Sequence, residues 1–277
     1  MSDLSPAARR PRVLLAMQRD LLPLLLDPAR TARLTGLADV DPALVADDFT
    51  GPGIAAELAR ADVLFTCWGC PPLRPEVLAG APWLRAVVHA AGSVKNFVTD
   101  ACWERGITVS SAADANALPV AEYALAMILL ANKRALRTRD RYRAVRGPLS
   151  WQHEYRDAGN YRRTVGIVGA SRTGRRLISL LAPYDMEILV HDPYLEPGEA
   201  RALGVRRVEL DELCAACDVV SLHAPALPGT RHMIDERRLK LMADGVTLVN
   251  TARGALVDTD ALTRELAGGR PARRARC

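Results

Sequence analysis

The chain has no long apolar run that is free of charged residues. The longest nearly uncharged stretch, Leu118–Ala131, contains Glu122 and is too short to span a lipid bilayer. Near the N-terminus, Arg19 and Asp20 interrupt the apolar residues that begin at Val13–Met17, so the core of a secretory signal peptide is also lacking. These absences predict a cytoplasmic protein with no membrane partner.

A basic surface suited to nucleic acid is lacking as well. The formal net charge is +5, but four of the last eight residues are arginines, at positions 270, 273, 274 and 276. Without these four charges the balance falls from +5 to +1, so the rest of the chain has no basic bias. We therefore expect no nucleic-acid partner.

Cysteine is sparse, with six residues, but four of them form two C-x-x-C pairs: Cys67 with Cys70, and Cys214 with Cys217. Four thiolates with this spacing could hold a zinc ion. The alternative is that these side chains simply pack, because each pair lies where one predicted element runs into the next. We expect packing roles, no metal site, and no disulfides in a cytoplasmic chain.

The remaining composition is that of a globular protein. Apolar residues make up 49% and charged residues 25% of the 277 positions, and the mean hydropathy is 0.00. This length suggests about two domains. Apart from the arginine-rich end, we find no internal repeat or low-complexity tract.

Strand-like segments alternate with helical ones along the chain. This alternation predicts an α/β fold with parallel sheets that are covered on both faces. In the first half we expect strands at 13–17, 62–66, 85–89 and 107–110, and helices near 21–37, 54–60 and 97–105. In the second half we expect strands at 164–168, 187–190, 205–208, 218–222 and 246–250.

A long helix is expected between the two halves. Asn116 is predicted to cap it, with Pro119 in the first turn, where a missing N–H costs nothing. We expect the helix to continue through Arg134 and Arg137 to about Gly147. It is interpreted as a connector, which places one domain at 1–115 and the other at 116–277.

Residues 164–192 are predicted to form a strand, a glycine-rich turn, a helix and a second strand. The turn, Gly169–Gly174, reads GASRTG, and Asp192 follows the second strand, 23 residues after Gly169. This layout is typical of a dinucleotide site, in which N–H groups at the helix start hold the pyrophosphate. Asp192 would accept hydrogen bonds from the adenosine ribose, which favours NAD over NADP.

Ser171 stands where the pattern usually has its second glycine. Its side chain could crowd the approach to the phosphates, or its hydroxyl could donate to a phosphate oxygen. The strand, the helix and the acid at the expected spacing still favour a dinucleotide site over an ordinary turn.

Three further segments resemble the D-isomer-specific 2-hydroxyacid dehydrogenases: 106–130 (GITVSSAADANALPVAEYALAMILL), 218–234 (DVVSLHAPALPGTRHMI) and 246–258 (VTLVNTARGALVD). They occur in the family's order and in register with the nucleotide turn. The resemblance implies two doubly wound, Rossmann-like parallel-sheet domains, the first flavodoxin-like and substrate-binding, with the active site in the cleft between them. It also implies hydride transfer between NAD and a small 2-hydroxy or 2-keto acid, and a homodimer.

The resemblance also assigns substrate-site residues. Arg253 matches the family's catalytic arginine, whose planar guanidinium can hold carboxylate and carbonyl oxygens together. Gly92 and Ser93 match the loop whose N–H groups hold the substrate carboxylate. Lys95 stands where the family usually has an acid; it could alter the preferred substrate charge or remain solvated, and we expect the latter.

The cofactor contacts implied by the resemblance involve the turn, the acid and two later loops: Gly169, Ala170, Ser171, Arg172, Thr173, Gly174, Asp192, His223, Ala224, Pro225, Thr230, Thr251 and Ala252. His223 matches the family's cofactor loop rather than its acid/base histidine. The other four histidines, at positions 89, 153, 191 and 232, match no catalytic position, so we expect structural or surface roles for them.

The chain departs from the family pattern after Arg253. Family members carry a glutamate and an acid/base histidine farther along, whereas 24 residues follow Arg253 here and end in RPARRARC. That ending has no strand character and suggests a truncation, by a frameshift or a premature end, with a natural variant as the alternative. Because histidine usually supplies the acid/base step, we expect weak activity or none, and an uncovered sheet edge. The alternatives are a non-catalytic NAD-binding protein and an unstable fragment.

Overall fold

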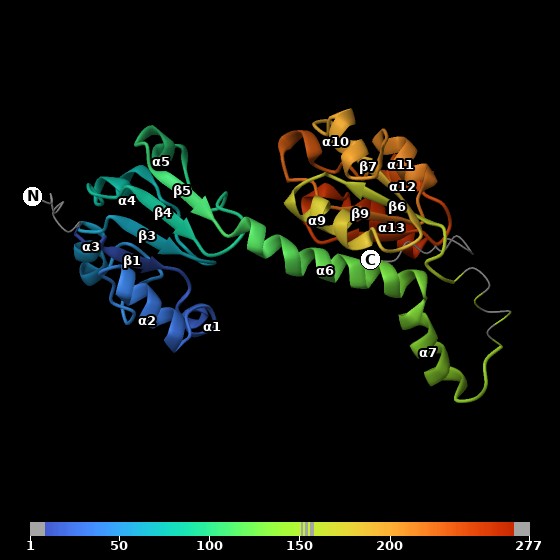
Figure 1. Ribbon diagram of the computed structural model, residues 1–277, viewed down its shortest axis with the longest axis horizontal. Helices are drawn as coiled ribbons and strands as arrows, with labels where there is room; N and C mark the ends of the chain where they lie inside the picture. The colour runs from blue at the N-terminus through green and yellow to red at the C-terminus, as the bar shows by residue number, and fades with distance from the viewer. Residues whose placement is uncertain (1–8, 151, 153–154, 156–157, 269–277) are drawn as a thin grey trace, which may run out of the picture. The chain divides into compact units, whose positions relative to one another are not determined.

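The structure is a computed structural model that describes residues 9–150, 152, 155 and 158–268. It divides the chain into two compact units, Met1–Asn116 and Ala117–Cys277. Each unit has one five-stranded sheet with helices packed around it (Figure 1). The predicted α/β fold with two parallel sheets is therefore confirmed. The arginine-rich end at 270–277 lies outside the described residues.

The first unit has the strand order β2-β1-β3-β4-β5, and all its strand pairs are parallel. The strands are β1 (Val13–Ala16), β2 (Val45–Ala46), β3 (Val63–Thr66), β4 (Ala86–His89) and β5 (Thr108–Ser111). The helices are η1 (Arg19–Leu21), α1 (Leu22–Leu25), α2 (Pro28–Leu37), α3 (Pro52–Leu58), α4 (Pro75–Ala79) and α5 (Asp100–Glu104). Prolines begin α2, α3 and α4, where a missing N–H leaves no helical hydrogen bond unmade.

The core of the first unit lies between its sheet and the covering helices. Leu14, Leu64 and Val87, from three adjacent strands, are 0–3% exposed. They pack with Leu78 of α4 and Cys102 of α5 in one buried cluster. This packing fixes the strand register. Because β3 and β4 are parallel neighbours that end opposite each other, the loops that follow them leave the sheet at the same edge.

The second unit has the strand order β10-β9-β6-β7-β8, again with parallel pairs. Its strands are β6 (Arg163–Val168), β7 (Met186–His191), β8 (Arg206–Arg207), β9 (Val219–Leu222) and β10 (Thr247–Asn250). Its helices after β6 are α9 (Arg172–Leu181), α10 (Pro197–Ala202), α11 (Leu210–Ala216), η2 (Pro228–Thr230), α12 (Glu236–Leu241), η3 (Gly254–Leu256) and α13 (Thr259–Ala267). Strand order switches direction beside β6, the position at which ligands bind in open parallel sheets.

The long helix differs from the prediction at its start. Helix α6 runs Ala113–Asn132, so Asn116 is inside the helix rather than its cap, and Pro119 lies in the helix interior. The N–H of Asn116 already donates to the carbonyl oxygen of Ala112, 2.9 Å away. Directly before the helix, Ala112 is anchored by its own N–H, which donates to the carbonyls of His89, at the end of β4, and Ala91, on the loop that follows β4.

The predicted continuation through Arg134 is also wrong. Arg134 adopts a left-handed backbone with φ of 53°, and a separate helix α7 (Ala135–Val145) follows. The carbonyl of Asn132 accepts a hydrogen bond from the N–H of Gly159 at 2.9 Å, a tertiary contact made at the point where α6 ends. The helix therefore breaks where no glycine or proline signals a break.

Helix α6 is the one helix in the described part of the chain that is long and apolar enough to cross a membrane, judged by length and composition. A core helix of a globular protein passes the same test. Its residues Ala121, Ala124 and Ile128 are fully buried and pack in a cluster with Ile167 of β6 and Leu177 of α9. One face of α6 is thus part of the core of the second unit.

Candidate functional site

Four strands of the second unit deliver predicted site residues to one edge of the sheet. Strands β6, β7, β9 and β10 are parallel, and Gly169, Asp192, His223 and Thr251 each follow directly after one of them. Parallel strands end at the same edge, and this is the edge at which doubly wound sheets bind their ligands. The sheet topology thus brings the predicted cofactor residues to one side of the second unit.

Gly169 opens the turn after β6 with a backbone that only glycine adopts easily. Its φ is +98°, in the region that side chains disfavour. A Cβ atom built on it would lie 2.7 Å from the nitrogen of Ala224 and 2.9 Å from the carbonyl carbon of His223. The turn therefore lies directly against the loop after β9, and the predicted contacts of these two segments adjoin.

Gly174 allows helix α9 to lie close to the turn. A Cβ atom at this position would be 2.1 Å from the carbonyl oxygen of Gly169, a distance that real Cβ atoms do not reach. Ser171 caps the helix, with its Oγ accepting a hydrogen bond from the N–H of Gly174 at 3.3 Å. Arg172 and Thr173 begin the helix, and N–H groups at a helix start are oriented to bind an anion.

The sequence leaves open whether the Ser171 side chain crowds the approach to the phosphates or donates to a phosphate oxygen. The backbone φ of Ser171 is −65°, a value that any L-residue adopts, so this position does not need glycine. Its oxygen is engaged in capping α9. The side chain therefore supports the turn.

Asp192 ties the end of β7 to the glycine turn. One carboxylate oxygen accepts from the N–H of Ala170 at 2.7 Å, and the other accepts from the N–H of Tyr194 at 2.9 Å. Each oxygen keeps a further lone pair, so both can still accept from ribose hydroxyls. The close-packed glycines, the capped helix start and this carboxylate together fit the pyrophosphate and ribose of a dinucleotide.

His223 is buried, and its Nε2 shares a hydrogen bond with the hydroxyl of Ser221 at 2.8 Å. Burial lowers the pKa of His223 from 6.5 to about 4, so the ring is neutral at physiological pH. A fixed neutral ring suits a loop that borders a cofactor better than an acid/base role. The loop itself is held by Thr230, whose hydroxyl donates to the carbonyl of Pro225 at 2.6 Å.

Arg253 lies on the loop after β10, with an exposed side chain. The side-chain amide of Asn250 holds this loop by two hydrogen bonds: its Nδ2 donates to the carbonyl of Arg253 at 2.9 Å, and its Oδ1 accepts from the N–H of Ala252 at 3.1 Å. The guanidinium donates to the carbonyl of Ala252 at 2.8 Å. Thr251, which lies between Asn250 and Ala252 in the sequence, has a buried hydroxyl without a hydrogen-bond partner in the described residues.

In the first unit, Gly92 and Ser93 follow β4 on a supported loop. His89 ends the strand, with its ring Nδ1 hydrogen-bonded to the hydroxyl of Thr66 at 2.9 Å. A Cβ atom on Gly92 would lie 3.1 Å from the side-chain nitrogen Nδ2 of Asn116. The Asn116 side chain thus packs against this loop, and Lys95, three residues after Gly92, is exposed as expected.

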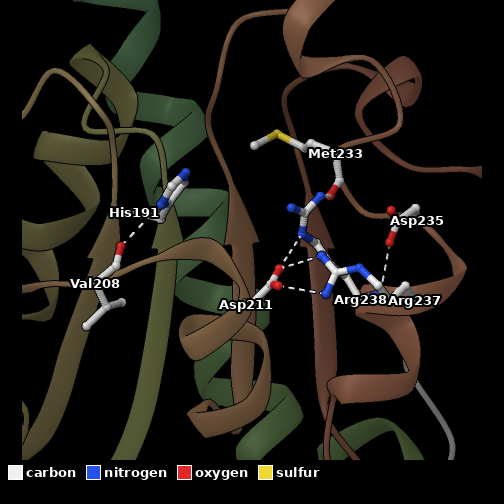
Figure 2. A network of polar contacts seen from close by, with 7 residues as sticks. All are labelled: His191, Val208, Asp211, Met233, Asp235, Arg237 and Arg238. Atoms are coloured by element: carbon white, nitrogen blue, oxygen red, sulfur yellow. Dashed lines mark hydrogen bonds and ion pairs between the residues drawn. The ribbon is translucent and has the colours of Figure 1, made fainter.

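Two sets of polar contacts outside the glycine turn join secondary-structure elements of the second unit, as Figure 2 shows. His191 precedes Asp192, and its ring Nδ1 is 3.1 Å from the carbonyl oxygen of Val208, which ties β7 to the end of β8. On α11, Asp211 accepts hydrogen bonds from Arg237 and Arg238 of α12. These arginines lower the pKa of Asp211. The first contact holds two neighbouring strands together, and the second holds α11 against α12.

The cysteines of the two C-x-x-C pairs are buried or half-buried free thiols. Burial raises the pKa of Cys70, Cys214 and Cys217 to about 12, so these thiols are neutral. Among the residues that the structure describes, no group of three or more His, Cys, Asp or Glu side chains could hold a metal ion.

Two residues that the sequence reasoning missed are bonded to predicted ones: Ser221, the partner of His223, and Asn250, the support of the arginine loop. Ser221 and Asn250 could have been suspected from their positions at strand ends.

Comparison with known proteins identifies a matching family model, "D-isomer specific 2-hydroxyacid dehydrogenase, NAD binding domain", over residues 125–275. The chain is 35% identical over 195 residues to the D-3-phosphoglycerate dehydrogenase of Mycobacterium tuberculosis, covering 70% of this chain and 36% of that protein. It is 37% identical over 194 residues to the (S)-sulfolactate dehydrogenase of Chromohalobacter salexigens, covering 69% of this chain and 61% of that protein. The chain thus spans about a third of the length of the mycobacterial relative.

Solved structures of dehydrogenases are also similar to this chain. The D-lactate dehydrogenase of Aquifex aeolicus, complexed with NAD and lactic acid, superposes with a TM-score of 0.72 at 29% identity, covering 93% of this chain and 73% of that one. A formate dehydrogenase from Granulicella superposes with a TM-score of 0.68 at 28% identity, covering 86% and 64% of the two chains.

Proposed function

The chain belongs to the D-isomer-specific 2-hydroxyacid dehydrogenases with an NAD-binding domain, and from this premise we propose that it transfers a hydride between NAD and a small 2-hydroxy or 2-keto acid. The observation that carries the proposal is the β6–α9 turn. Gly169 and Gly174 leave no room for side chains there, and Asp192 is bonded to the same turn.

In this proposal the turn residues 169–174 bind the pyrophosphate, and Asp192 binds the ribose hydroxyls. Ala224, Pro225 and Thr230 border the cofactor on the loop after β9, beside the neutral ring of His223. Thr251 and Ala252 border its nicotinamide. When bound, NAD supplies the hydride chemistry, and the protein positions and polarises the substrate.

The substrate roles fall to two loops. The N–H groups of Gly92 and Ser93 hold the substrate carboxylate. The guanidinium of Arg253 stabilises the negative charge that develops on the carbonyl oxygen as the hydride is added. The loop geometry set by Asn250 keeps Arg253 at the carboxyl edge of the sheet.

We further propose that the protein acts as a cytoplasmic homodimer. Along α6, the apolar side chains of Tyr123, Met127 and Leu130 line a groove of about 230 Å³ with residues of β10 and Leu262 of α13. Tyr123 is 58% exposed and Leu130 is 41% exposed. Apolar side chains left open in this way are typical of an association surface, and sedimentation velocity would report the dimer.

The binding half of the proposal is tested by a thermal melt with NADH. A ligand at 100 times its Kd stabilises a protein by about 2.7 kcal/mol, which corresponds to a rise of roughly 5–10 °C in Tm for a unit of this size. An unchanged Tm would refute cofactor binding.

The catalytic half is tested by following NADH absorbance with glyoxylate, pyruvate and hydroxypyruvate. We expect Arg253→Ala to lower kcat/KM by about 100- to 1000-fold, the usual loss when an oxyanion donor is removed. Arg201→Ala, which removes an exposed arginine on α10, is the matched control and should leave kcat/KM unchanged. Binding of NADH without turnover of any acid would replace this proposal with a non-catalytic NAD-binding role.

A further inference from the structure

Strand β10 forms one edge of the second unit's sheet. It pairs with β9 on one side, and among the described residues no strand pairs with its other side. The N–H of Thr247 donates to the carbonyl of Asp218, just before β9, at 3.0 Å. Successive residues of a strand direct their backbone N–H and C=O groups to opposite sides, so Leu248 and Asn250 direct theirs away from β9. These groups are oriented to pair with a further strand.

The sequence at this edge favours a strand from another molecule. Residues 247–250 read Thr-Leu-Val-Asn and contain neither a charged residue nor a proline, the residue types that commonly block edge pairing. Residues 269–277, which follow the last described residue, contain Pro271 and four arginines. Proline cannot donate to a strand ladder, and adjacent arginines repel one another. The next residues of the same chain are therefore poorly suited to pair with β10.

Apolar side chains flank the edge on both faces of the sheet. Val249 packs in the buried cluster that contains α6, whereas Leu248 packs in the cluster that contains Ala261 of α13. Because neighbouring side chains of a strand point to opposite faces, α6 and α13 cover opposite faces beside β10. The groove of about 230 Å³ is lined by β10, α6 and Leu262 of α13. It therefore lies where a further strand would extend the sheet.

Strand β10 is complementary to itself under a twofold axis. If two copies align antiparallel with Leu248 opposite Leu248, the N–H of each Leu248 can donate to the carbonyl of the other. In the same register, the N–H of Asn250 in each copy meets the carbonyl of Val246 in the other. Thr247 then lies opposite Val249, a β-branched pair of the kind that stabilises sheets. A twofold homodimer requires a patch that matches itself in this way.

We propose that two copies of this chain join edge to edge through β10, antiparallel about Leu248, so that their two five-stranded sheets become one continuous sheet. The twofold axis is perpendicular to the sheet, so the α6 helices of both copies lie on the same face. There the exposed Tyr123 and Leu130 side chains of each copy face the other copy. This inference rests on the homodimer of the proposed function, and it goes further in naming the contact and its register.

The test measures amide hydrogen exchange of the full chain at high and low protein concentration, with sedimentation velocity reporting the dimer at each concentration. We expect the N–H groups of Leu248 and Asn250 to exchange at least about tenfold more slowly in the dimer, because only the dimer bonds them. The N–H of Thr247 is the internal control, since it is bonded to Asp218 within each copy. Its exchange rate should change by less than about twofold.

A pair of variants separates the groove from the rest of the surface. Leu130→Glu places a charge in the groove and should weaken dimerisation at least about tenfold in Kd. It should also restore fast exchange of Leu248 and Asn250 at concentrations where the unaltered chain is a dimer. Leu241→Glu on α12 is the matched control, because Leu241 is 39% exposed, against 41% for Leu130, and does not line the groove. It should keep the dimer and the slow exchange.

The outcomes distinguish this contact from the homodimer and from catalysis. A dimer in which Leu248 and Asn250 exchange as fast as in the monomer overturns the β10 contact and leaves the homodimer standing. Slow exchange of both amides at every concentration also overturns it, because a segment of the same chain then covers the edge. A chain that stays monomeric overturns both the contact and the homodimer. NADH oxidation is measured separately, so its absence would refute hydride transfer alone.

Discussion

Replacing Gly174 with alanine tests the central packing contact of the candidate cofactor site. The added Cβ would lie 2.1 Å from the carbonyl oxygen of Gly169, against a lower limit of about 3.0 Å for real Cβ contacts. The neighbouring atom is backbone, so it cannot rotate away. Helix α9 or the turn would have to move by about 1 Å, in a region where Ile178 and Leu181 are at most 2% exposed.

Such overpacking costs about 1–3 kcal/mol in the free energy of unfolding. For a unit of this size, that loss lowers Tm by roughly 2–12 °C. The moved helix start would also misplace the N–H groups assigned to the pyrophosphate, so we expect NADH affinity to fall at least about tenfold, or about 1.4 kcal/mol.

Gly198→Ala is the matched control, because the chemistry is identical and the position is open. Gly198 lies in α10 of the same unit, does not have a positive φ, and would place an added Cβ with nothing within 4 Å of it. This variant should be as stable as the unaltered protein or more stable by up to about 1 kcal/mol. Thermal melts and NADH titrations of both variants decide the matter. If Gly174→Ala melts and binds like Gly198→Ala, the close approach of α9 to the turn is not what shapes this site.

Three further predictions concern neighbouring contacts. Burial holds the pKa of His223 at about 4 instead of 6.5, so as pH falls this histidine is protonated in the unfolded chain before it is protonated in the folded one. The free energy of unfolding should therefore drop by up to about 3 kcal/mol between pH 6.5 and 4. Thermal melts of His223→Gln should show a shallower pH dependence. Two arginines lower the pKa of Asp211, so its stabilisation is complete above its ordinary pKa and is lost as pH falls below it. Asp211→Asn should therefore lower Tm at neutral pH and low salt, with a smaller difference in concentrated NaCl. Ser171→Ala should cost about 1 kcal/mol in chemical denaturation and Ser171→Gly only a few tenths, and both should still bind NADH in fluorescence titrations, because the hydroxyl caps α9 and is not assigned to the phosphates.

The part of the fold that local sequence determines could be predicted. The β6–α9–β7 segment follows from apolar runs, a glycine turn and an acid at a set spacing, and each of these is legible along the chain. Strands β2 and β8 have two residues each, too few to show periodicity, and β2 was missed altogether. The α6–α7 break was missed because the residues around it contain no glycine or proline, and the hydrogen bond at this point comes from Gly159, 27 residues after Asn132.

The candidate site also contains some residues that the sequence reveals and others that it does not. The sequence shows the glycines at positions where a side chain would not fit, and the acid that follows a strand, as Gly169, Gly174 and Asp192 illustrate. The supports of a site are not visible, because they depend on which strands become neighbours. Asn250 and Ser221 act on residues two or three positions away, yet their roles depend on the direction in which each strand end turns.

Helix α6 shows why composition alone cannot assign a role to an apolar helix. Its residues Ala121, Ala124 and Ile128 recur at intervals of three and four, and all are 0% exposed against the second unit's sheet. The small alanines let the helix lie close to the strands, so this face needs no other partner. Tyr123 and Leu130 remain exposed on the groove beside β10. A helix that is apolar on more sides than its own unit covers has a second surface to bury, and the proposed homodimer accounts for that surface without assigning α6 to a membrane.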